Sequence, residues 1–319
     1  MPPLVLVTGA SGKIGHYVVS ELLERGYSVR AVTSRPASDH AASDGLEWCQ
    51  LDFQKSLDFD PLVHGCAAVL HLGAEITAAE RMPRSNAEAT RALAEACERA
   101  GVKFLGYTSS VAVYGSSRRR LVTEDSPVLT PDRDVRGEYW ASESLRCYGR
   151  TKLQGELAIR EVARSVERAI VRPTVVVDTS DLIALSNWTK MMKQRGAARH
   201  AHLIYVRDVA DVMIWLMEEG LHRSQASSDV RVFNLAEDNS TIRTYGQLFN
   251  YAYRVTGDRR WHVLSIPWVV EWLWVIINCR RLIFRQPFGR MLFSGEKLQE
   301  AGYKFRFGMS QVIGEFAGS

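Results

Sequence analysis

The sequence lacks the cysteine patterns of zinc proteins and of disulfide-stapled secreted domains. Its 319 residues include five cysteines, with no C-x-x-C pair and no His/Cys spacing typical of a zinc site. An odd number of unpatterned cysteines indicates reduced thiols. We therefore expect no metal site and a cytoplasmic location.

Long hydrophobic runs and a strong charge imbalance are also absent. The most membrane-like segment, Trp268–Ile277, is about half the length that spans a bilayer and contains Glu271. The N-terminus has no basic leader, which argues against a signal peptide. A net charge of +4 is too small to indicate nucleic-acid binding. We expect no transmembrane helix and no nucleic-acid partner.

What the sequence does contain is an alternation of strand and helix patterns. Apolar strand patterns at 4–8, 28–33, 47–51, 68–72, 104–109 and 169–173 alternate with helical patterns at 14–25, 86–100 and 140–165. This order predicts βαβ units and a doubly wound parallel α/β sheet. Beyond Pro173 the pattern loosens into a helix at 181–193, a strand at 203–206, a helix at 209–219, a strand at 230–235 and a helix at 244–255. This half predicts a smaller C-terminal α+β cap, whereas the polar stretch 115–139 predicts a surface loop.

Three glycines directly follow the first strand pattern, at Gly9, Gly12 and Gly15. Glycine permits a sharp turn and close backbone approach, and the N-terminus of the following helix attracts a pyrophosphate. The alternative is a tight turn with no ligand. The spacing predicts a Rossmann-type NAD(P)-binding domain over residues 1–172. Residues 173–319 would then be mainly the substrate-binding cap, with some segments returning to the first domain.

The end of the second strand pattern has no acidic residue between Arg30 and Pro36. NAD sites place an Asp or Glu here to accept a hydrogen bond from the ribose 2′-hydroxyl. Arg35 is instead placed to meet a 2′-phosphate, and Ser34 and Lys13 could assist. The sequence therefore favours NADP(H) over NAD(H). The alternative for Arg35 is a surface arginine without a partner.

Tyr148 and Lys152 lie four residues apart in a helical pattern, so they share one helix face. A nearby ammonium lowers the pKa of a phenol from its ordinary value of ~10, which makes proton transfer to a substrate oxygen feasible. Ser109 and Ser110 follow the fifth strand pattern, at the sheet edge where such folds bind ligands. A serine hydroxyl there can hold the reacting oxygen, although a simple turn is the alternative.

Taken in order, these motifs resemble the extended short-chain dehydrogenase/reductase family, which includes epimerases, dehydratases, 3β-hydroxysteroid dehydrogenases and dihydroflavonol-type reductases. The matching segments are T-G-A-S-G-K-I-G at 8–15, L-D-F at 51–53, H-L-G-A at 71–74, S-N-A-E-A-T at 85–90, T-S-S-V-A-V-Y-G at 108–115, Y-G-R-T-K at 148–152, V-R-P-T at 171–174, Y-V-R-D-V-A at 205–210 and F-N-L-A at 233–236. The family often dimerises through helices that correspond to 86–100 and 140–165, so a homodimer is an expectation of the resemblance.

The resemblance also implies roles for individual residues. Ser110 would be the catalytic serine, with Ser109 the less favoured neighbour, and Tyr148 would be the acid–base. Lys152 would assist Tyr148 and bind the nicotinamide ribose, and Asn86 would be structural or catalytic. The candidate cofactor-binding residues are Gly9, Ser11, Gly12, Lys13, Ile14, Gly15, Ser34, Arg35, Asp52, Phe53, Leu72, Gly73, Ala74, Tyr148, Lys152, Pro173, Thr174 and Val175.

At two places the sequence differs from the motifs of particular family members, and these differences favour one reaction of the family over others. Ser109-Ser110 stand where the dehydratases carry an Asp-Glu pair, and Pro173-Thr174-Val175 differ from the aromatic and Asn that follow the Arg in sugar-nucleotide epimerases. We therefore predict an NADP(H)-dependent oxidoreductase that interconverts a carbonyl and a secondary alcohol on a mainly apolar small molecule. The alternatives are a nucleotide-sugar epimerase and, in another class, a non-catalytic NADP(H)-binding sensor or scaffold.

Aromatic residues concentrate near the C-terminal end of the cap. They are Trp261, Trp268, Trp272, Trp274, Phe284, Phe288 and Phe293. We interpret them first as core or an oligomer interface and second as the wall of an apolar substrate pocket. Association with a membrane surface is a minor alternative.

Overall fold

The computed structural model describes residues 2–40, 43–115, 117, 119–130, 143–237, 242–263, 269, 273 and 291–318. Its centre is a seven-stranded parallel sheet in the order β10-β7-β5-β4-β1-β2-β3. The strands are β1 (Leu4–Thr8), β2 (Ser28–Thr33), β3 (Leu46–Gln50), β4 (Ala68–His71), β5 (Phe104–Thr108), β7 (Glu167–Pro173) and β10 (Arg231–Leu235). The predicted doubly wound fold is confirmed. The winding direction reverses between β1 and β4, the point at whose carboxyl ends such sheets typically bind ligands.

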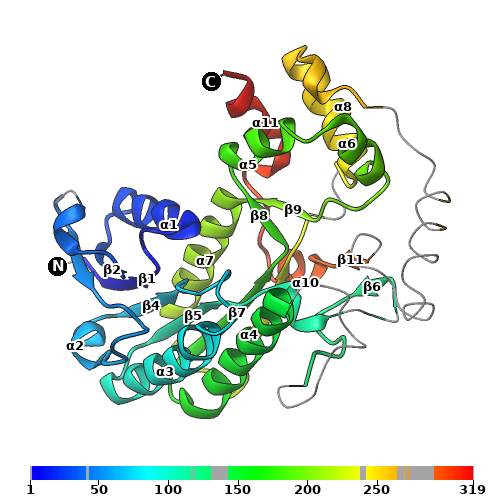
Figure 1. Cartoon of the computed structure of the whole chain (residues 1–319). Helices are drawn as coiled ribbons and strands as arrows, with labels where there is room; N and C mark the ends of the chain where they lie inside the picture. Colours follow the sequence, from blue (N-terminus) through cyan, green and yellow to red (C-terminus); the bar gives the residue numbers. More distant parts are fainter. Residues whose placement is uncertain are drawn as a thin grey trace.

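Helices cover both faces of the sheet, and the burial of the strands follows from that (Figure 1). Helices α1 (Lys13–Glu24) and α7 (Val206–Leu221) pack on one face. Helices α2 (Asp60–Val63), α3 (Ala89–Ala100) and α4 (Glu143–Val162) pack on the other. Strands β4, β5 and β7 are buried along their whole length. Covered on both faces, β4 and β5 are mainly apolar in sequence, whereas β7 also buries the charged side chains of Glu167, Arg168 and Arg172.

The C-terminal half contributes to the sheet and also forms the cap. Helix α7 and strand β10 return to the sheet, whereas the remaining cap elements gather around a separate hydrophobic core. These elements are β8 (Val175–Val177), α5 (Thr179–Ser186), α6 (Lys190–Gly196), β9 (Leu203–Tyr205), α8 (Tyr245–Thr256), the 3₁₀ turn Arg259–Trp261 and α11 (Gly308–Gly318). Within the described residues, no helix is both long enough and apolar enough to cross a bilayer.

Several local expectations need correction. The helix predicted over 181–193 is two helices, because α5 ends at Ser186 and Thr189 starts α6 by accepting a hydrogen bond from the Met192 amide. The 86–100 helix begins as a π-helical turn, Pro83–Glu88, before α3. The loop expected at 115–139 contains β6 (Leu121–Val122), which pairs with β11 (Leu292–Phe293) from the far end of the chain, just before α10 (Glu296–Glu300).

The aromatic residues of the cap divide into described and undescribed ones. Trp261 is fully buried, and its ring centroid lies 6.0 Å from that of Phe249 and 5.6 Å from that of Phe316. Phe293 is also buried. These two side chains belong to the core, as the first interpretation predicts. Trp268, Trp272, Trp274, Phe284 and Phe288 lie outside the described residues.

Candidate active site

The glycine turn joins β1 to α1 through contacts that leave no room for side chains. Gly9 has a positive φ of 66°, and the Gly12 amide donates to the Gly9 carbonyl at 2.9 Å. A Cβ at Gly15 would lie 2.1 Å from the Gly9 carbonyl oxygen. Helix α1 therefore starts directly against the turn. Its N-cap, Gly12, has no side chain to occupy the first amides, which suits an anionic group.

The end of β4 packs against the glycine turn. A Cβ on Gly9 would lie 2.7 Å from Gly73 Cα, and a Cβ on Gly73 would lie 2.9 Å from the Phe53 ring. The Gly73 amide donates to Thr8 Oγ1 at 3.2 Å. Gly9, Phe53 and Gly73, predicted separately, thus meet at the point where the winding direction of the sheet reverses.

Several other candidate residues are placed as follows. Asp52 accepts a hydrogen bond from the Gln54 amide at 2.9 Å, Leu72 is half-buried and Ala74 is exposed. At the end of β7, the Thr174 amide donates to the Leu235 carbonyl at 3.0 Å, and Val175 is exposed. Ile14, in the first turn of α1, is partly buried and packs against the core of the sheet half. Pro173 is the buried last residue of β7.

The residues predicted to meet the adenosine ribose lie at the end of β2. Ser11 Oγ lies 2.9 Å from Thr33 Oγ1, which ties the glycine turn to this strand end. Ser34 and Arg35 are exposed, and the Arg35 amide donates to Thr33 Oγ1 at 3.2 Å. The Arg35 side chain is therefore accessible at the position where a 2′-phosphate would be recognised.

Lys13, at the first position of α1, faces the cap. Its ammonium pairs with the Asp181 carboxylate and lies 3.7 Å from an oxygen of Asp178. Both acids belong to the capping box at the start of α5. Lys13 therefore links the glycine turn to the cap, an ion pair that the sequence did not predict. Its role toward a 2′-phosphate stays a prediction.

Ser110 and Tyr148 are brought together by β5 and α4. The Ser110 hydroxyl lies close enough to the Tyr148 phenol to act on its pKa, and Ser110 Oγ accepts from the Ala112 amide at 3.1 Å. Burial raises the pKa of Tyr148 to about 12, although the Ser110 hydroxyl lowers it. The sequence predicted a lowered pKa, and this expectation is wrong for the chain alone because burial outweighs the effect of Ser110.

Lys152 lies one turn further along α4 and is 1% exposed. Its Nζ atom lies 4.5 Å from the centroid of the Tyr107 ring. Burial lowers the pKa of Lys152 to about 7, whereas Glu156 raises it. Within the described residues, this ammonium makes no hydrogen bond or ion pair. A nearly enclosed cation of this kind fits the hydroxyl groups of a ribose.

Asn86 holds the π-helical turn in place. It is fully buried, its Oδ1 accepts from the Glu75 amide at 2.8 Å, and its Nδ2 donates to the Glu75 carbonyl at 2.9 Å. Its Nδ2 also donates to Thr151 Oγ1 on α4 at 3.2 Å. Of the two roles predicted for Asn86, structural or catalytic, these contacts support the structural one.

The sequence reasoning missed a buried polar network beneath the serines. Ser109 is 2% exposed and its hydroxyl donates to Glu156 Oε1 at 2.6 Å, so it faces the core whereas Ser110 faces Tyr148. Glu156 also forms a two-point ion pair with Arg172. A glutamate four residues after Lys152, on a helix face otherwise directed at the sheet, could have indicated this network.

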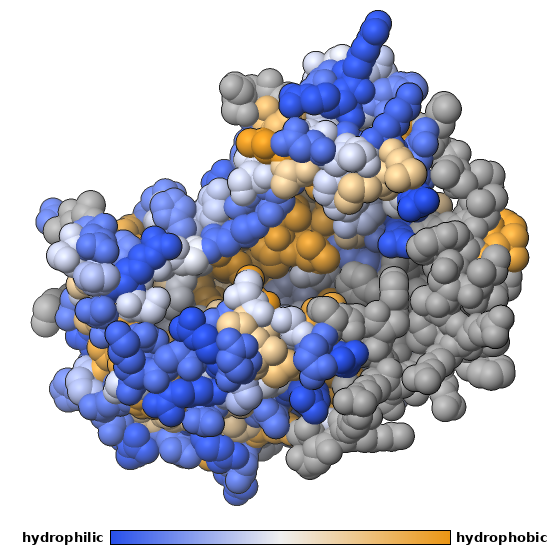
Figure 2. Space-filling model, viewed as in Figure 1, coloured by the Kyte–Doolittle hydropathy of each residue, from blue (hydrophilic) through white to orange (hydrophobic). Residues whose placement is uncertain are grey.

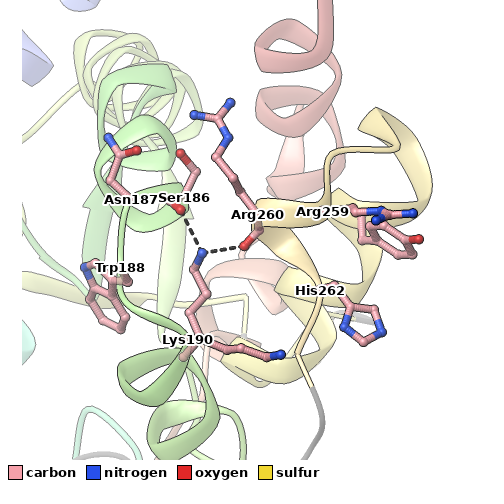
Figure 3. Close-up of a pocket in the computed structure, with 9 residues that line it drawn as sticks. Ser186, Asn187, Trp188, Lys190, Arg259, Arg260 and His262 are labelled. Carbon is pink, nitrogen blue, oxygen red and sulfur yellow. Dashed lines mark hydrogen bonds between the residues drawn. The ribbon is translucent and has the colours of Figure 1, made fainter.

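A cavity of about 610 Å³ lies elsewhere, in the cap between α6 and the Arg259–Trp261 turn. Figure 3 shows Lys190 and Trp188 on one side of it and Arg259 and His262 on the other. Lys193 holds the two walls together by donating to the carbonyls of Ser186, at 2.7 Å, and Arg260. None of its lining residues is a candidate site residue, so this cavity is distinct from the candidate active site.

A separate hollow lies between two parts of the molecule. Figure 2 shows it between the part of the molecule that carries the sheet and the part that carries α5, α6 and α8. Hydrophobic surface covers its floor over α7 and β8. Val175 of β8, 40% exposed, is one of the exposed apolar side chains in this half.

Comparison with known proteins identifies the family. The model of the NAD dependent epimerase/dehydratase family matches residues 5–236, which include the glycine turn, both serines and helix α4. The chain belongs to this family. The predicted resemblance to extended short-chain dehydrogenases/reductases is confirmed.

Two relatives are reductases. Cinnamoyl-CoA reductase 1 from Oryza sativa subsp. japonica is 29% identical over 185 residues, which are 54% of this chain and 53% of that enzyme. The match thus spans about half the length of the rice enzyme. Dihydroflavonol 4-reductase from Zea mays is 26% identical over 329 aligned positions, covering 95% of this chain and 84% of that enzyme.

Solved structures share the fold over nearly the whole chain. Vestitone reductase from alfalfa (Medicago sativa) superposes with a TM-score of 0.71 at 17% identity, covering 99% of this chain and 97% of that one. MoeE5 in complex with UDP-glucose and NAD superposes with a TM-score of 0.70 at 22% identity, covering 98% and 97%. At these identities the superpositions establish the fold alone.

Proposed function

We propose that the protein is an NADP(H)-dependent oxidoreductase that interconverts a carbonyl and a secondary alcohol on a mainly apolar small molecule. The observation that carries this proposal is Ser110 acting on the phenol of Tyr148, with the buried Lys152 one helix turn away. Ser110 follows the carboxyl end of β5 and Lys152 lies over the Tyr107 ring of the same strand, which supports a site at the edge where such sheets bind ligands.

Ser110, Tyr148 and Lys152 would have different roles around the substrate oxygen. A bound nicotinamide would supply or accept the hydride at the carbonyl carbon. Ser110 holds the oxygen by a hydrogen bond, and Tyr148 donates or takes the proton there. Because the pKa of Tyr148 is raised to about 12, the phenol is protonated at neutral pH, which suits reduction of a carbonyl. Lys152, with a pKa of about 7, can hold a ribose hydroxyl and stabilise the phenolate as it forms.

The preference for NADP(H) depends on the end of β2. Arg35 and Ser34 are exposed there, and the strand ends in Thr33 with no acid before Pro36. A guanidinium pairs strongly with a phosphate but gives little to a 2′-hydroxyl. The NAD of the MoeE5 complex belongs to that protein, and in this chain the residues at the strand end favour the phosphorylated cofactor.

The substrate class is inferred from the hollow and from the relatives. The hydrophobic floor over α7 and β8 suits an apolar molecule, and the two curated relatives are named as reductases. A nucleotide-sugar epimerase is the second candidate, supported by the name of the family model and by the likeness to MoeE5 with UDP-glucose.

A spectrophotometric screen separates these candidates. Purified protein is mixed with NADPH or NADH and a panel of ketones, aldehydes and UDP-sugars, and absorbance at the reduced-nicotinamide band is followed over time. The proposal predicts NADPH consumption with apolar ketones or aldehydes. Interconversion of UDP-sugars without net cofactor consumption would establish the epimerase instead. Tight NADPH binding with no turnover in either arm would indicate the sensor or scaffold.

A further inference from the structure

A chain of buried polar groups connects the elements that carry the candidate catalytic residues. Arg172 of β7 donates from Nη1 to the Tyr114 hydroxyl at 2.8 Å, and that hydroxyl donates to Asn234 Oδ1 of β10 at 2.7 Å. The backbone N–H of Asn234 donates to a carboxylate oxygen of Glu124 at 2.7 Å. The chain thus extends from the sheet to the polar segment that follows β6.

Glu156 of α4 is the anionic centre of this chain. Its Oε1 accepts from Arg172 Nε at 2.9 Å and from Ser109 Oγ at 2.6 Å, and its Oε2 accepts from Arg172 Nη2 at 2.6 Å. The exposed fractions of the Glu156 and Arg172 side chains are 1% and 4%. Two buried charges are costly to desolvate, and a two-point pair with an added hydroxyl donor is the geometry that offsets this cost.

Each of the three linked residues, Glu156, Ser109 and Arg172, lies near a candidate site residue in the sequence. Glu156 follows Lys152 by four residues on α4, so both lie on one helix face. Ser109 directly precedes Ser110, and Arg172 directly precedes Pro173 at the end of β7. A displacement of the Glu156 carboxylate would therefore be transmitted to all three parts of the candidate site.

We propose that Glu156 is a positioning residue of the active site: held by Arg172 and Ser109, its carboxylate fixes the β5 and β7 ends against α4 and supplies the negative charge that faces Lys152. This inference rests on the proposed function, since the residues that Glu156 would position are the candidate catalytic residues Lys152 and Ser110.

The other titratable groups around Lys152 are neutral at pH 7, which leaves Glu156 as the charge that changes the pKa of Lys152. His71 of β4 is fully buried, and burial together with Lys152 lowers its pKa to about 3, so it stays neutral. Tyr107 of β5 and Tyr148 of α4 have raised pKa values and also stay neutral at pH 7. Among the described residues, Glu156 is the charged group that shifts the pKa of Lys152, and it raises it.

Two variants that break the same ion pair separate charge from structure. Glu156→Gln removes the negative charge, whereas Arg172→Met removes the positive charge and leaves the carboxylate. Both lose the two-point pair, so a merely structural role predicts the same change in both. The proposal predicts that the titration midpoint of Lys152 falls by about one pH unit or more in Glu156→Gln and rises in Arg172→Met.

The titration is read directly by NMR of protein labelled with ¹³C-lysine. The chain has eight lysines, and the Lys152 ε-carbon signal is assigned as the one missing from Lys152→Met. No substrate or turnover is needed, so the result stands even if the proposed reaction is wrong. Shifts of equal sign in the two variants, or no shift in Glu156→Gln, would overturn the proposal.

A milder variant covers the case in which the charge variants do not fold. Ser109→Ala removes one hydrogen bond to Glu156 and keeps both charges. We expect an unchanged Lys152 titration and a loss of about three- to tenfold in kcat on a substrate from the screen, with little change in KM. An unchanged kcat would contradict the positioning of Ser110 through Glu156, and an altered titration would contradict the assignment of the charge effect to Glu156.

Discussion

Helices in the sheet half and in the cap differ at their N-termini. The first-turn N–H groups of the cap helices donate to capping side chains, whereas those of α1 do not. In the cap, α5, α6 and α8 are closed by side chains, since Asp178, Thr189 and Thr244 accept hydrogen bonds from the first turns. Helix α1 starts at Gly12, with no side-chain hydrogen bond at its cap. Side-chain capping closes a helix N-terminus, whereas an uncapped start beside a glycine turn leaves amides for an anion. We therefore expect the cofactor phosphates in the sheet half, with the cap left to shape the substrate space.

The largest expected effect is at Gly15, where the sheet half depends on a missing side chain. In Gly15→Ala the new Cβ would lie 2.1 Å from the Gly9 carbonyl oxygen and 2.7 Å from Ala10 Cα. Both are backbone atoms, so the turn itself must move. We expect stability to fall by about 3 kcal/mol or more and NADPH affinity by over tenfold. Thermal unfolding and NADPH fluorescence titration measure the two effects.

Gly196→Ala is the matched change in the cap. The nearest atom to its Cβ would be 3.9 Å away, on the Trp188 ring. Gly196 ends α6, where alanine is favoured over glycine by about 0.5–1 kcal/mol. Stability should hold or rise and NADPH affinity should not change. Equal damage from both variants would remove the distinction between the two halves.

The next effect is on stability at Lys152, a buried basic side chain. Its pKa is about 7, below the ordinary 10.5, so the unfolded chain binds more protons between these values and wild-type stability rises with pH across that window. Lys152→Met should therefore be more stable than wild type by about 1–4 kcal/mol below pH 7. This advantage should shrink as the pH rises toward 10.5. Urea unfolding at pH 6 and pH 9 tests it, and a variant less stable than wild type at pH 6 would contradict it.

Arg35 gives a smaller effect that is confined to one cofactor. Arg35→Ala should weaken NADPH binding by roughly tenfold or more, the value of a charge-assisted contact of about 1.5–3 kcal/mol, and leave NADH binding almost unchanged. Arg259→Ala, an exposed arginine of the cap, is the control and should change neither. Binding is followed by nicotinamide fluorescence. A wild type that binds NADH more tightly than NADPH would refute the cofactor preference.

The smallest expected effect is at the ion pair between the two halves. Asp181→Asn weakens the link from α5 to Lys13, whose side chain is 37% exposed. Partly exposed pairs contribute about 0–1 kcal/mol and are screened by salt. We expect Tm to fall by no more than about 2 °C in low salt, with no difference in 1 M NaCl. A larger fall that persists in high salt would mean that the pair fixes the cap in place.

The sequence was informative where local chemistry decides the structure. The glycine turn, the strands of the sheet and the pair Tyr148–Lys152 follow from spacing within short segments. The β6–β11 pairing and the Glu156–Arg172 ion pair could not be predicted, because each joins residues that meet only after the chain folds. The break between α5 and α6 was predictable in principle, since Thr189 is a favoured N-cap residue.

The pKa of Tyr148 shows a second limit. Residue spacing correctly placed a lysine one helix turn from the phenol, but the direction of the shift depends on burial, which the sequence does not specify. The same holds for the two serines: the sequence placed both at the end of β5, and only the fold shows Ser109 turned to Glu156 and Ser110 to Tyr148.

Turnover of Tyr148→Phe beside wild type, on any carbonyl substrate that the screen identifies, tests the central claim most directly. The substitution removes one hydroxyl, so folding and NADPH affinity, measured in parallel, should stay close to wild type. We predict a fall in kcat of roughly 10²–10⁴, as expected when a general acid–base is lost. Near-normal kcat with intact NADPH binding would remove Tyr148 from the mechanism and contradict the proposed reaction.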